Sequence, residues 1–163
     1  MLKHLYISQY ALIDELELAL EDGFSVITGE TGAGKSIIMG ALALVMGARA
    51  DAKSVREGAQ KCIVEATFQI TEYRLQITHF VRDFYSARHN EQALSALANR
   101  KNIQSTDNLS TLNSQLSTIF EEYGLDFEEE CVIRREVTAA GKSRAFVNDT
   151  PVTLQQMRAI ASL

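Results

Sequence analysis

The sequence predicts an α/β fold with antiparallel hairpins towards both ends of the chain and a helical segment between them. The first observation is an alternation of apolar and polar side chains, the period of two that is typical of β-strands. It runs through residues 3–8, 12–20, 62–70, 131–137 and 143–147. The second is residues 36–46, which are apolar almost all round and indicate a buried helix. The third is residues 72–122, which show no strand pattern and are strongly polar around 99–108, so two or three helices with a polar connection are expected.

The bulk composition is that of one ordinary globular domain. The chain has 163 residues, 46% of them apolar and 23% charged, enough for a hydrophobic core. A net charge of -5 argues against a protein that coats nucleic acid by charge alone, but it leaves room for a local basic patch. No apolar run approaches the roughly 20 residues of a membrane span, and the N-terminus lacks the pattern of a signal peptide. We therefore expect a cytoplasmic protein in which Cys62 and Cys131, which fit no metal spacing, are buried reduced thiols.

Turn and capping residues delimit the predicted elements. The first two strands end in a turn at residues 21–23, and the short apolar run 24–28 predicts a buried strand. Gly47 is the expected end of the helix that follows. Residues 138–142 include a glycine and are expected to link the last two strands as a hairpin.

The C-terminal part of the sequence predicts a turn and then a helix. Residues 148–151, Asn-Asp-Thr-Pro, have the composition of a turn, and Thr153 is the expected N-cap of the helix. The sequence stops inside this helix at Leu163, without a stop residue. We therefore expect the chain to be part of a longer one.

A glycine-rich loop joins the predicted buried strand to the apolar helix. Its spacing, a glycine, four residues and then Gly-Lys-Ser, is that of the phosphate-binding P-loop, or Walker A motif. The strand before it and the helix after it are the context that this motif requires. The sequence therefore predicts binding of a nucleoside triphosphate, namely ATP with Mg²⁺. The residues of the loop are Gly29, Glu30, Thr31, Gly32, Ala33, Gly34, Lys35 and Ser36.

Each residue type in this loop has a chemical reason. Glycines let the backbone turn and approach the phosphates without a Cβ clash, and successive N–H groups at the start of a helix attract phosphate oxygens. Lys35 is the expected catalytic residue, because its ammonium group would lie on the β- and γ-phosphates. Ser36 is the expected ligand of Mg²⁺ through its hydroxyl group. Positions 30, 31 and 33 need to offer only their backbone N–H groups.

Hydrolysis would require a carboxylate at the end of a second buried strand and a base that orients water. Asp14 and Glu15 end the apolar run 10–15, but this run lies before the P-loop in a predicted hairpin. Residues 146–149 are too short a run and lead into a turn. The chain is therefore expected to carry the binding part of an ATPase site without the hydrolytic part.

Several stretches resemble one family, in the same order along the chain. They are residues 24–51, which contain the GETGAGKS loop and match best, with residues 1–20, 54–58 (SVREG), 131–149 and 150–162. On these stretches the chain resembles the RecN-like bacterial DNA repair proteins, which are SMC-like members of the ABC ATPase superfamily. The resemblance implies a role in the recombinational repair of DNA double-strand breaks, in the cytoplasm and associated with the nucleoid.

The resemblance also implies a P-loop NTPase fold of the ABC/SMC type whose ATPase head is split in sequence. In this family an N-terminal lobe carries the P-loop, a long coiled coil follows, and a C-terminal lobe carries the signature motif and the Mg²⁺-site carboxylates. This chain would be one incomplete head lobe. Residues 1–70 would hold strands, P-loop and helix, residues 71–130 a helical, polar insertion, and residues 131–163 a β hairpin and the start of a helix. The implied partners are the C-terminal lobe of the same protein, a second head in a dimer, and DNA in the full-length protein.

Arginines and lysines outside the P-loop are further candidates. Arg56 sits where SMC-like heads place an arginine, so the resemblance implies that it reaches the nucleotide or couples ATP to DNA; a solvated loop arginine is the alternative. Arg49 is a weaker candidate for a similar role. A basic hairpin, which either contacts DNA or is solvated, has two adjacent arginines that strand alternation sends to opposite faces. Its basic residues are Arg134, Arg135, Lys142 and Arg144.

The segment between the two regions of strands departs from the family. The family passes from the strand near 62–70 to the hairpin at 131 by a short helical link, whereas about 60 residues intervene here. Residues 75–118 are therefore expected to form a surface excursion, and the acidic run 121–130 a solvated face.

Two other function classes are compatible with a P-loop. In a small nucleotide kinase or phosphotransferase, residues 72–122 would form a mobile lid that carries arginines. They are Arg74, Arg82, Arg88 and Arg100. In a transporter-type ABC subunit an aromatic side chain would stack on the adenine, and none is evidently placed to do so.

Overall fold

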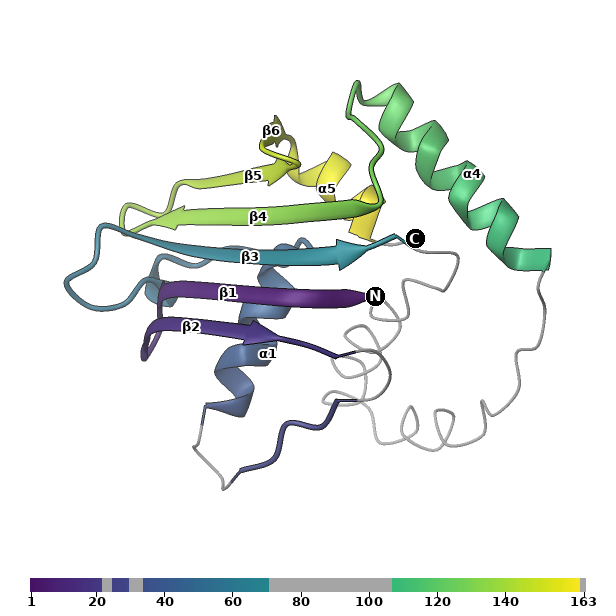
Figure 1. The fold of residues 1–163 in the computed structure, drawn as a ribbon. Coiled ribbons are helices and arrows are strands. Elements are labelled where there is room, and N and C mark those ends of the chain that lie inside the picture. The colour runs from purple at the N-terminus through teal and green to yellow at the C-terminus, as the bar shows by residue number, and fades with distance from the viewer. Residues whose placement is uncertain (22–24, 30–33, 71–106, 162–163) are drawn as a thin grey trace, which may run out of the picture.

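The computed structural model of the chain describes residues 1–21, 25–29, 34–70 and 107–161, and its centre is one six-stranded antiparallel sheet (Figure 1). The strand order is β2-β1-β3-β4-β5-β6, so each described strand pairs antiparallel with its neighbours. The strands are β1 (Leu2–Tyr10), β2 (Ile13–Ala19), β3 (Lys61–Gln69), β4 (Glu130–Thr138), β5 (Ser143–Val147) and β6 (Thr150–Val152). The helices are α1 (Lys35–Val45), the 3₁₀-helix η1 (Ala52–Ser54), α4 (Asp107–Glu122) and α5 (Leu154–Ala161).

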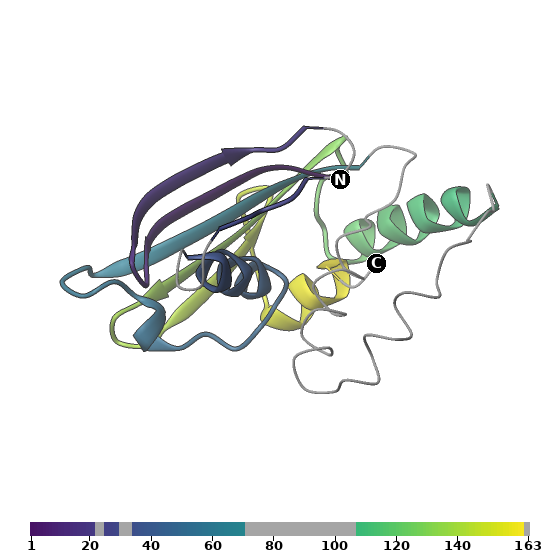
Figure 2. The ribbon, with the colours of Figure 1, turned by 90° about the horizontal axis from the view of Figure 1, so that it is seen from below.

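The core lies between one face of the sheet and helices α1 and α5, which cover that face (Figure 2). Strand alternation sends every second side chain inward, as in β4, where residues 131, 133, 135 and 137 are all buried. The opposite face carries polar and charged pairs such as His4 with Glu17. The pattern predicted from the sequence is therefore confirmed for both hairpins and for the strand at 62–70.

Helix α1 is confirmed, and it ends as predicted at Gly47. This residue has φ +95°, and the N–H groups of Gly47 and Ala48 bond to the carbonyl oxygens of Leu44 and Ala43 at 3.2 and 2.9 Å. These two bonds form a Schellman motif, which satisfies the last carbonyl groups of the helix. At Gly40 an added Cβ would lie 3.0 Å from the Tyr10 hydroxyl oxygen, so α1 packs closely on β1.

Helix α5 begins at the predicted cap. The N–H of Gln156 donates to the Thr153 hydroxyl at 3.2 Å, and the N–H of Thr153 donates to the Gln156 side-chain carbonyl at 2.8 Å. This reciprocal pair is a capping box. It fixes the start of a helix that buries Met157, Ile160 and Ala161.

The prediction of a buried strand at residues 24–28 is wrong for its described part. Residues 25–29 form no strand, and Val26 and Ile27 are 63% and 47% exposed. An apolar run becomes a strand only when its N–H and C=O groups find ladder partners. None of the described residues supplies such partners to this segment.

The predicted turn at 148–151 is shorter than expected. Asn148 and Asp149 have φ +46° and +61° and form a two-residue hairpin turn, while Thr150 and Pro151 already belong to β6. Pro151 is tolerated because β6 lies at the edge of the sheet, where a missing N–H costs no ladder bond. Asn148 also anchors the turn, since the N–H of Val132 donates to its side-chain oxygen at 2.8 Å.

The polar segment between β3 and β4 is described only from residue 107. There α4 confirms a helix, and it buries Leu116 and Phe120 against the core. Residues 75–118 were expected to form a surface excursion, and the buried Leu116 differs from that expectation. An amphipathic helix next to the sheet has an apolar stripe to bury. The division of the chain at residues 71 and 130 stays a prediction. No helix among the described residues is long and apolar enough to cross a membrane.

Candidate functional site

The candidate site lies at the start of α1, where the predicted P-loop ends. Gly34 is the N-cap of the helix, with φ +89°, a conformation that favours glycine. The N–H groups of Ile37 and Ile38 bond to its carbonyl oxygen at 2.9 and 3.1 Å. Gly34 has no side chain that could cap the helix, so an anion can serve as the partner of the first N–H groups.

Lys35 connects the two ends of the loop. Its ammonium group donates a hydrogen bond to the carbonyl oxygen of Gly29, six residues earlier. The first and last parts of the P-loop are thereby close together, as a loop that wraps a phosphate requires. Ser36 is exposed, so its hydroxyl group is accessible from solvent. Glu30, Thr31, Gly32 and Ala33 lie outside the described residues.

The helix that carries this site is packed against the sheet along its C-terminal half. Its C-terminal half, Ala41 to Val45, is buried against the sheet, whereas its first turn is less covered. A buried helix with one accessible N-terminus can hold a small set of N–H groups and one lysine in a fixed direction. This arrangement suits the recognition of phosphate groups.

Arg56 is positioned by the first hairpin. Its N–H bonds to the carbonyl oxygen of Gln9 at 2.8 Å, and its guanidinium group lies 3.7 Å from the Asp14 carboxylate. The Arg56 side chain is 39% exposed, so this ion pair is a weak one. The structure gives Arg56 no contact with the described P-loop residues, and its predicted role stays a prediction. Arg49 is exposed on the loop after α1.

The carboxylates considered for hydrolysis lie in β2 and are engaged elsewhere. Asp14 accepts a hydrogen bond from the Gln9 side chain, and Glu15 accepts one from the Tyr6 hydroxyl at 3.0 Å. Both belong to a hairpin strand and not to the end of a strand that follows the P-loop. Within the described ranges no three His, Cys, Asp or Glu side chains are grouped as a metal site would need.

The basic hairpin does not present its charges on one surface. Arg134 lies on the outer face, 3.0 Å from the Asp149 carboxylate and 3.7 Å from that of Glu65, with its guanidinium carbon 4.6 Å from the centre of the Phe146 ring. Arg135 is 2% exposed on the inner face. Arg134 and Arg135 therefore lie on opposite faces, as strand alternation predicts, and DNA contact by the exposed members stays a prediction.

Arg135 is the residue whose importance the sequence interpretation missed. The signal was available, because strand alternation places position 135 between the inward-facing Ile133 and Val137. A cation on the apolar face of a strand is unusual. The buried charge of Arg135 therefore has a structural cause or a role that the P-loop does not explain.

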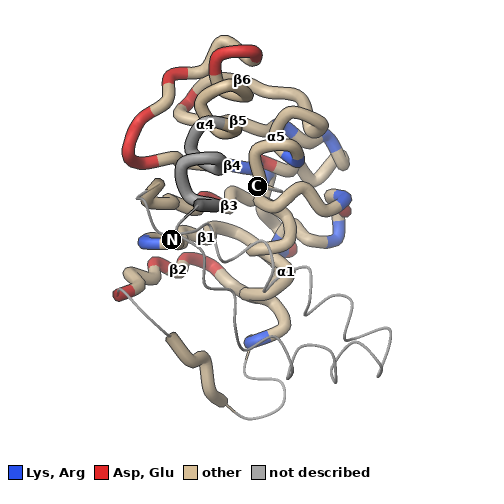
Figure 3. The backbone as a smooth tube through the Cα atoms, turned by 90° about the vertical axis from the view of Figure 1, so that its right-hand side faces the viewer, with Lys and Arg blue, Asp and Glu red and all other residues tan. Residues whose placement is uncertain are grey.

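The acidic run and the two cysteines behave as expected. Figure 3 shows acidic residues gathered on the connection between α4 and β4, where residues 126 and 128–130 are exposed. Cys62 and Cys131 are free and buried. Burial raises the pKa of the Cys131 thiol to about 12, so this thiol is protonated and unreactive near neutral pH.

The sequence of this chain is similar to those of known proteins. A family model described as "AAA domain" matches residues 4–156. The DNA repair protein RecN of Haemophilus influenzae is 34% identical over 161 residues, and that of Vibrio cholerae is 34% identical over 163 residues. These alignments cover 99% and 100% of this chain, but the chain spans only 22% of the length of either relative.

Solved structures of SMC ATPase heads share the fold. One comes from work on the ATP-driven dimerisation and DNA-stimulated activation of SMC ATPases, with a TM-score of 0.61 and 18% identity over 99% of this chain and 78% of that one. Another is an Smc head bound to the C-terminal winged-helix domain of ScpA, with a TM-score of 0.59 and 18% identity over 99% of this chain and 40% of that one. At this identity the likeness concerns the fold.

Proposed function

Because the chain belongs to the AAA-domain family and is RecN-like along nearly its whole length, we propose that it is the ATP-binding N-terminal lobe of a DNA repair ATPase. The observation that carries the proposal is the start of α1, where Gly34 is the N-cap and the Lys35 ammonium group donates to the carbonyl oxygen of Gly29. This is the position at which a P-loop holds the phosphates of a nucleotide.

Each P-loop residue then has a role in binding. The N–H groups of residues 29–34 would donate to the β- and γ-phosphate oxygens, and Lys35 would leave the Gly29 carbonyl to neutralise them. The hydroxyl group of Ser36 would be a ligand of Mg²⁺, the ion that lowers the charge of the triphosphate. Arg56 would add a cation if the first hairpin and the nucleotide approach each other.

Hydrolysis would need a second lobe. The exposed Val26 and Ile27 support this requirement, because an apolar segment without ladder partners is a suitable place for added strands. The proposed partners are the C-terminal lobe of the same protein, a second head and, in the full-length protein, DNA. The proposed role is recombinational repair of double-strand breaks in the cytoplasm, at the nucleoid.

Reconstitution of turnover tests this proposal. The chain alone should hydrolyse no ATP, whereas the chain co-expressed with the C-terminal lobe of a RecN relative should do so in the presence of Mg²⁺. Lys35→Ala in the same pair should remove the activity. Turnover by the isolated chain at ordinary enzyme rates, on the order of 1 per second or faster, would contradict the proposal.

A nucleotide kinase is the alternative that the relatives do not favour. Its proposed lid arginines at positions 74, 82, 88 and 100 lie outside the described residues. A screen for phosphoryl transfer from ATP to nucleoside monophosphates distinguishes the two functions. Transfer by the chain alone would favour the kinase, and no transfer is expected.

A further inference from the structure

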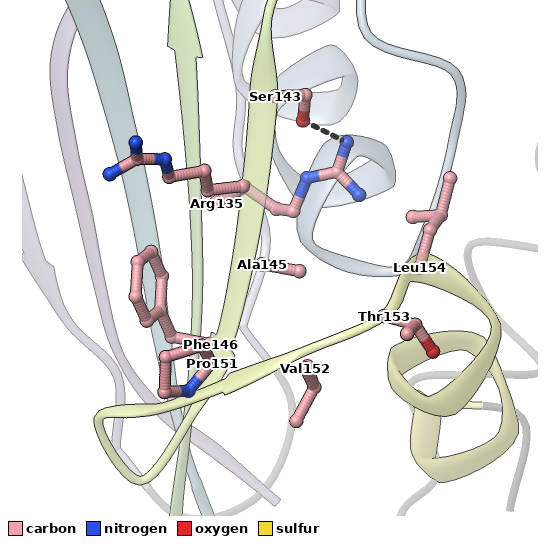
Figure 4. A pocket seen from close by; sticks show the side chains of 9 residues that line it. Arg135, Ser143, Ala145, Phe146, Pro151, Val152, Thr153 and Leu154 are labelled. Atoms are coloured by element: carbon pink, nitrogen blue, oxygen red, sulfur yellow. Dashed lines mark hydrogen bonds between the residues drawn. The ribbon is translucent and has the colours of Figure 1, made fainter.

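We propose that a cavity beside β5 and the start of α5 binds a phosphate-like oxyanion through the guanidinium group of Arg135. The cavity is open to solvent and has a volume of about 510 Å³. Its lining comes from β4, β5, β6 and the first residues of α5, with Ala145, Val152 and Leu154 among the apolar side chains (Figure 4). None of the lining residues belongs to the P-loop, so this is a second site.

Arg135 is a buried cation whose hydrogen bonding is incomplete. The side chain is 2% exposed, and its Nε has no hydrogen-bond partner in the described structure. Its Nη2 donates to the Ser143 hydroxyl oxygen at 2.6 Å, the bond drawn in Figure 4. No carboxylate among the described residues lies within ion-pair distance of Arg135. Since an unpaired buried charge is strongly unfavourable, an anion in the adjoining cavity would stabilise the fold.

A second cation makes the local charge more positive. Burial is the main cause that lowers the pKa of Arg135. The positive charge of Arg158, in α5, is the second cause. The Nε of Arg158 donates to the carbonyl oxygen of Gly47 at 2.7 Å, and no carboxylate in the described ranges pairs with it. Arg158 is exposed and does not line the cavity, so its charge adds to the positive potential around Arg135 without contacting a ligand there.

Charge favours phosphate over a carboxylate. A phosphate monoester or inorganic phosphate carries about -1.5 to -2 charges at neutral pH, which suits the positive charge of Arg135 with that of Arg158 nearby. The planar fork of a guanidinium group fits the oxygens of phosphate and of carboxylate alike, so the preference for phosphate comes from its larger charge. Ser143 accepts from Arg135, so its own proton remains to be donated to the ligand.

Thermal unfolding of the 163-residue chain tests the site. The background is Lys35→Ala, which removes phosphate binding at the P-loop, and inorganic phosphate is titrated at constant ionic strength against sodium chloride. The melting temperature should rise and saturate with phosphate. The rise should be lost in Lys35→Ala/Arg135→Gln. It should be kept in Lys35→Ala/Lys53→Gln, a matched control, because Lys53 is an exposed cation that does not line the cavity.

The phosphate effect on the melting temperature of these variants decides whether Arg135 binds the anion. No phosphate effect in the Lys35→Ala chain, or an equal effect after Arg135→Gln, would overturn the proposal. An effect of sodium acetate in place of phosphate would overturn the phosphate assignment. If circular dichroism shows that Arg135→Gln does not fold, Ser143→Ala serves instead, and the half-saturating phosphate concentration should rise about tenfold, as for loss of one charge-assisted hydrogen bond.

Discussion

Gly47 is a single residue on which the packing of α5 against the end of α1 depends. Its φ of +95° disfavours any side chain, and an added Cβ would lie 2.3 Å from Cγ of Arg158. Gly47→Ala should therefore lower the free energy of unfolding by about 2–4 kcal/mol, the sum of backbone strain and displacement of Arg158. Urea denaturation followed by circular dichroism measures this change.

Gly58 is the matched control for this substitution. It has φ +84°, but an added Cβ would meet nothing within 4 Å. Gly58→Ala should cost only the backbone strain, about 1–2 kcal/mol. Equal losses at the two glycines would show that Arg158 does not lie against Gly47.

Individual residues differ in how far the sequence predicts them. Gly47 and Thr153 were predicted as a helix end and a helix cap because their roles are local and depend on a few neighbouring residues. Arg135 was placed on a strand, but its burial depends on α5 and on the loop after α1, which pack there from distant parts of the chain. Arg134 finds its partners Glu65 and Asp149 only through strand pairing.

Among the elements, α5 is the one whose formation depends most on its first residue. It has only eight residues, and its apolar side chains close one side of the core. Thr153→Ala removes the capping box and should cost about 1 kcal/mol. The change is measured as a shift in the midpoint of urea unfolding, with Gln155→Ala, at an exposed position of the same helix, as the control that should leave the midpoint nearly unchanged.

Helix α4 provides a test of whether the segment before β4 belongs to the core. Phe120 is fully buried, and its ring meets that of Phe127 edge-on with the centroids 5.4 Å apart. Phe120→Ala should lower the free energy of unfolding by about 3–5 kcal/mol, as for other buried aromatic residues. The same urea titration measures it.

The control for α4 is Glu121→Ala, one residue further on and exposed. It should change stability by less than about 0.5 kcal/mol. If Phe120→Ala left the main unfolding transition unchanged as well, the C-terminal part of α4 would not belong to the core.

Elements were predicted well where their pattern is amphipathic. Apolar and polar side chains alternate along the strands of both hairpins and along β3, and this alternation indicates which face of each strand is buried. Residues 24–28 are apolar without alternation, a pattern that predicts burial only if a partner covers the segment. Within the described residues none does, so residues 25–29 form no strand. Strand β6 was missed because its three residues include a proline, which the sequence alone assigns to a turn.

In the described part of the molecule, helices α1 and α5 lie against one face of the sheet, and Ser36 at the start of α1 is exposed. The likeness to SMC heads covers 99% of this chain and concerns the fold, since the aligned identity is only 18%. The P-loop residues stay a prediction, which the sequence allows because the motif is contiguous. The geometry of hydrolysis was not, because it would be shared with other parts of the full-length protein.

The affinity for ATP tests the central claim most directly. Equilibrium binding of Mg²⁺–ATP is measured for the chain co-expressed with a C-terminal lobe of a RecN relative, as wild type, Lys35→Ala and Lys53→Ala, the last at an exposed lysine outside the P-loop. Lys35→Ala should weaken binding by about ten- to a hundredfold, as for the loss of charge-assisted bonds to phosphate, and Lys53→Ala should not change it. Unchanged affinity in Lys35→Ala would show that the start of α1 does not hold the triphosphate.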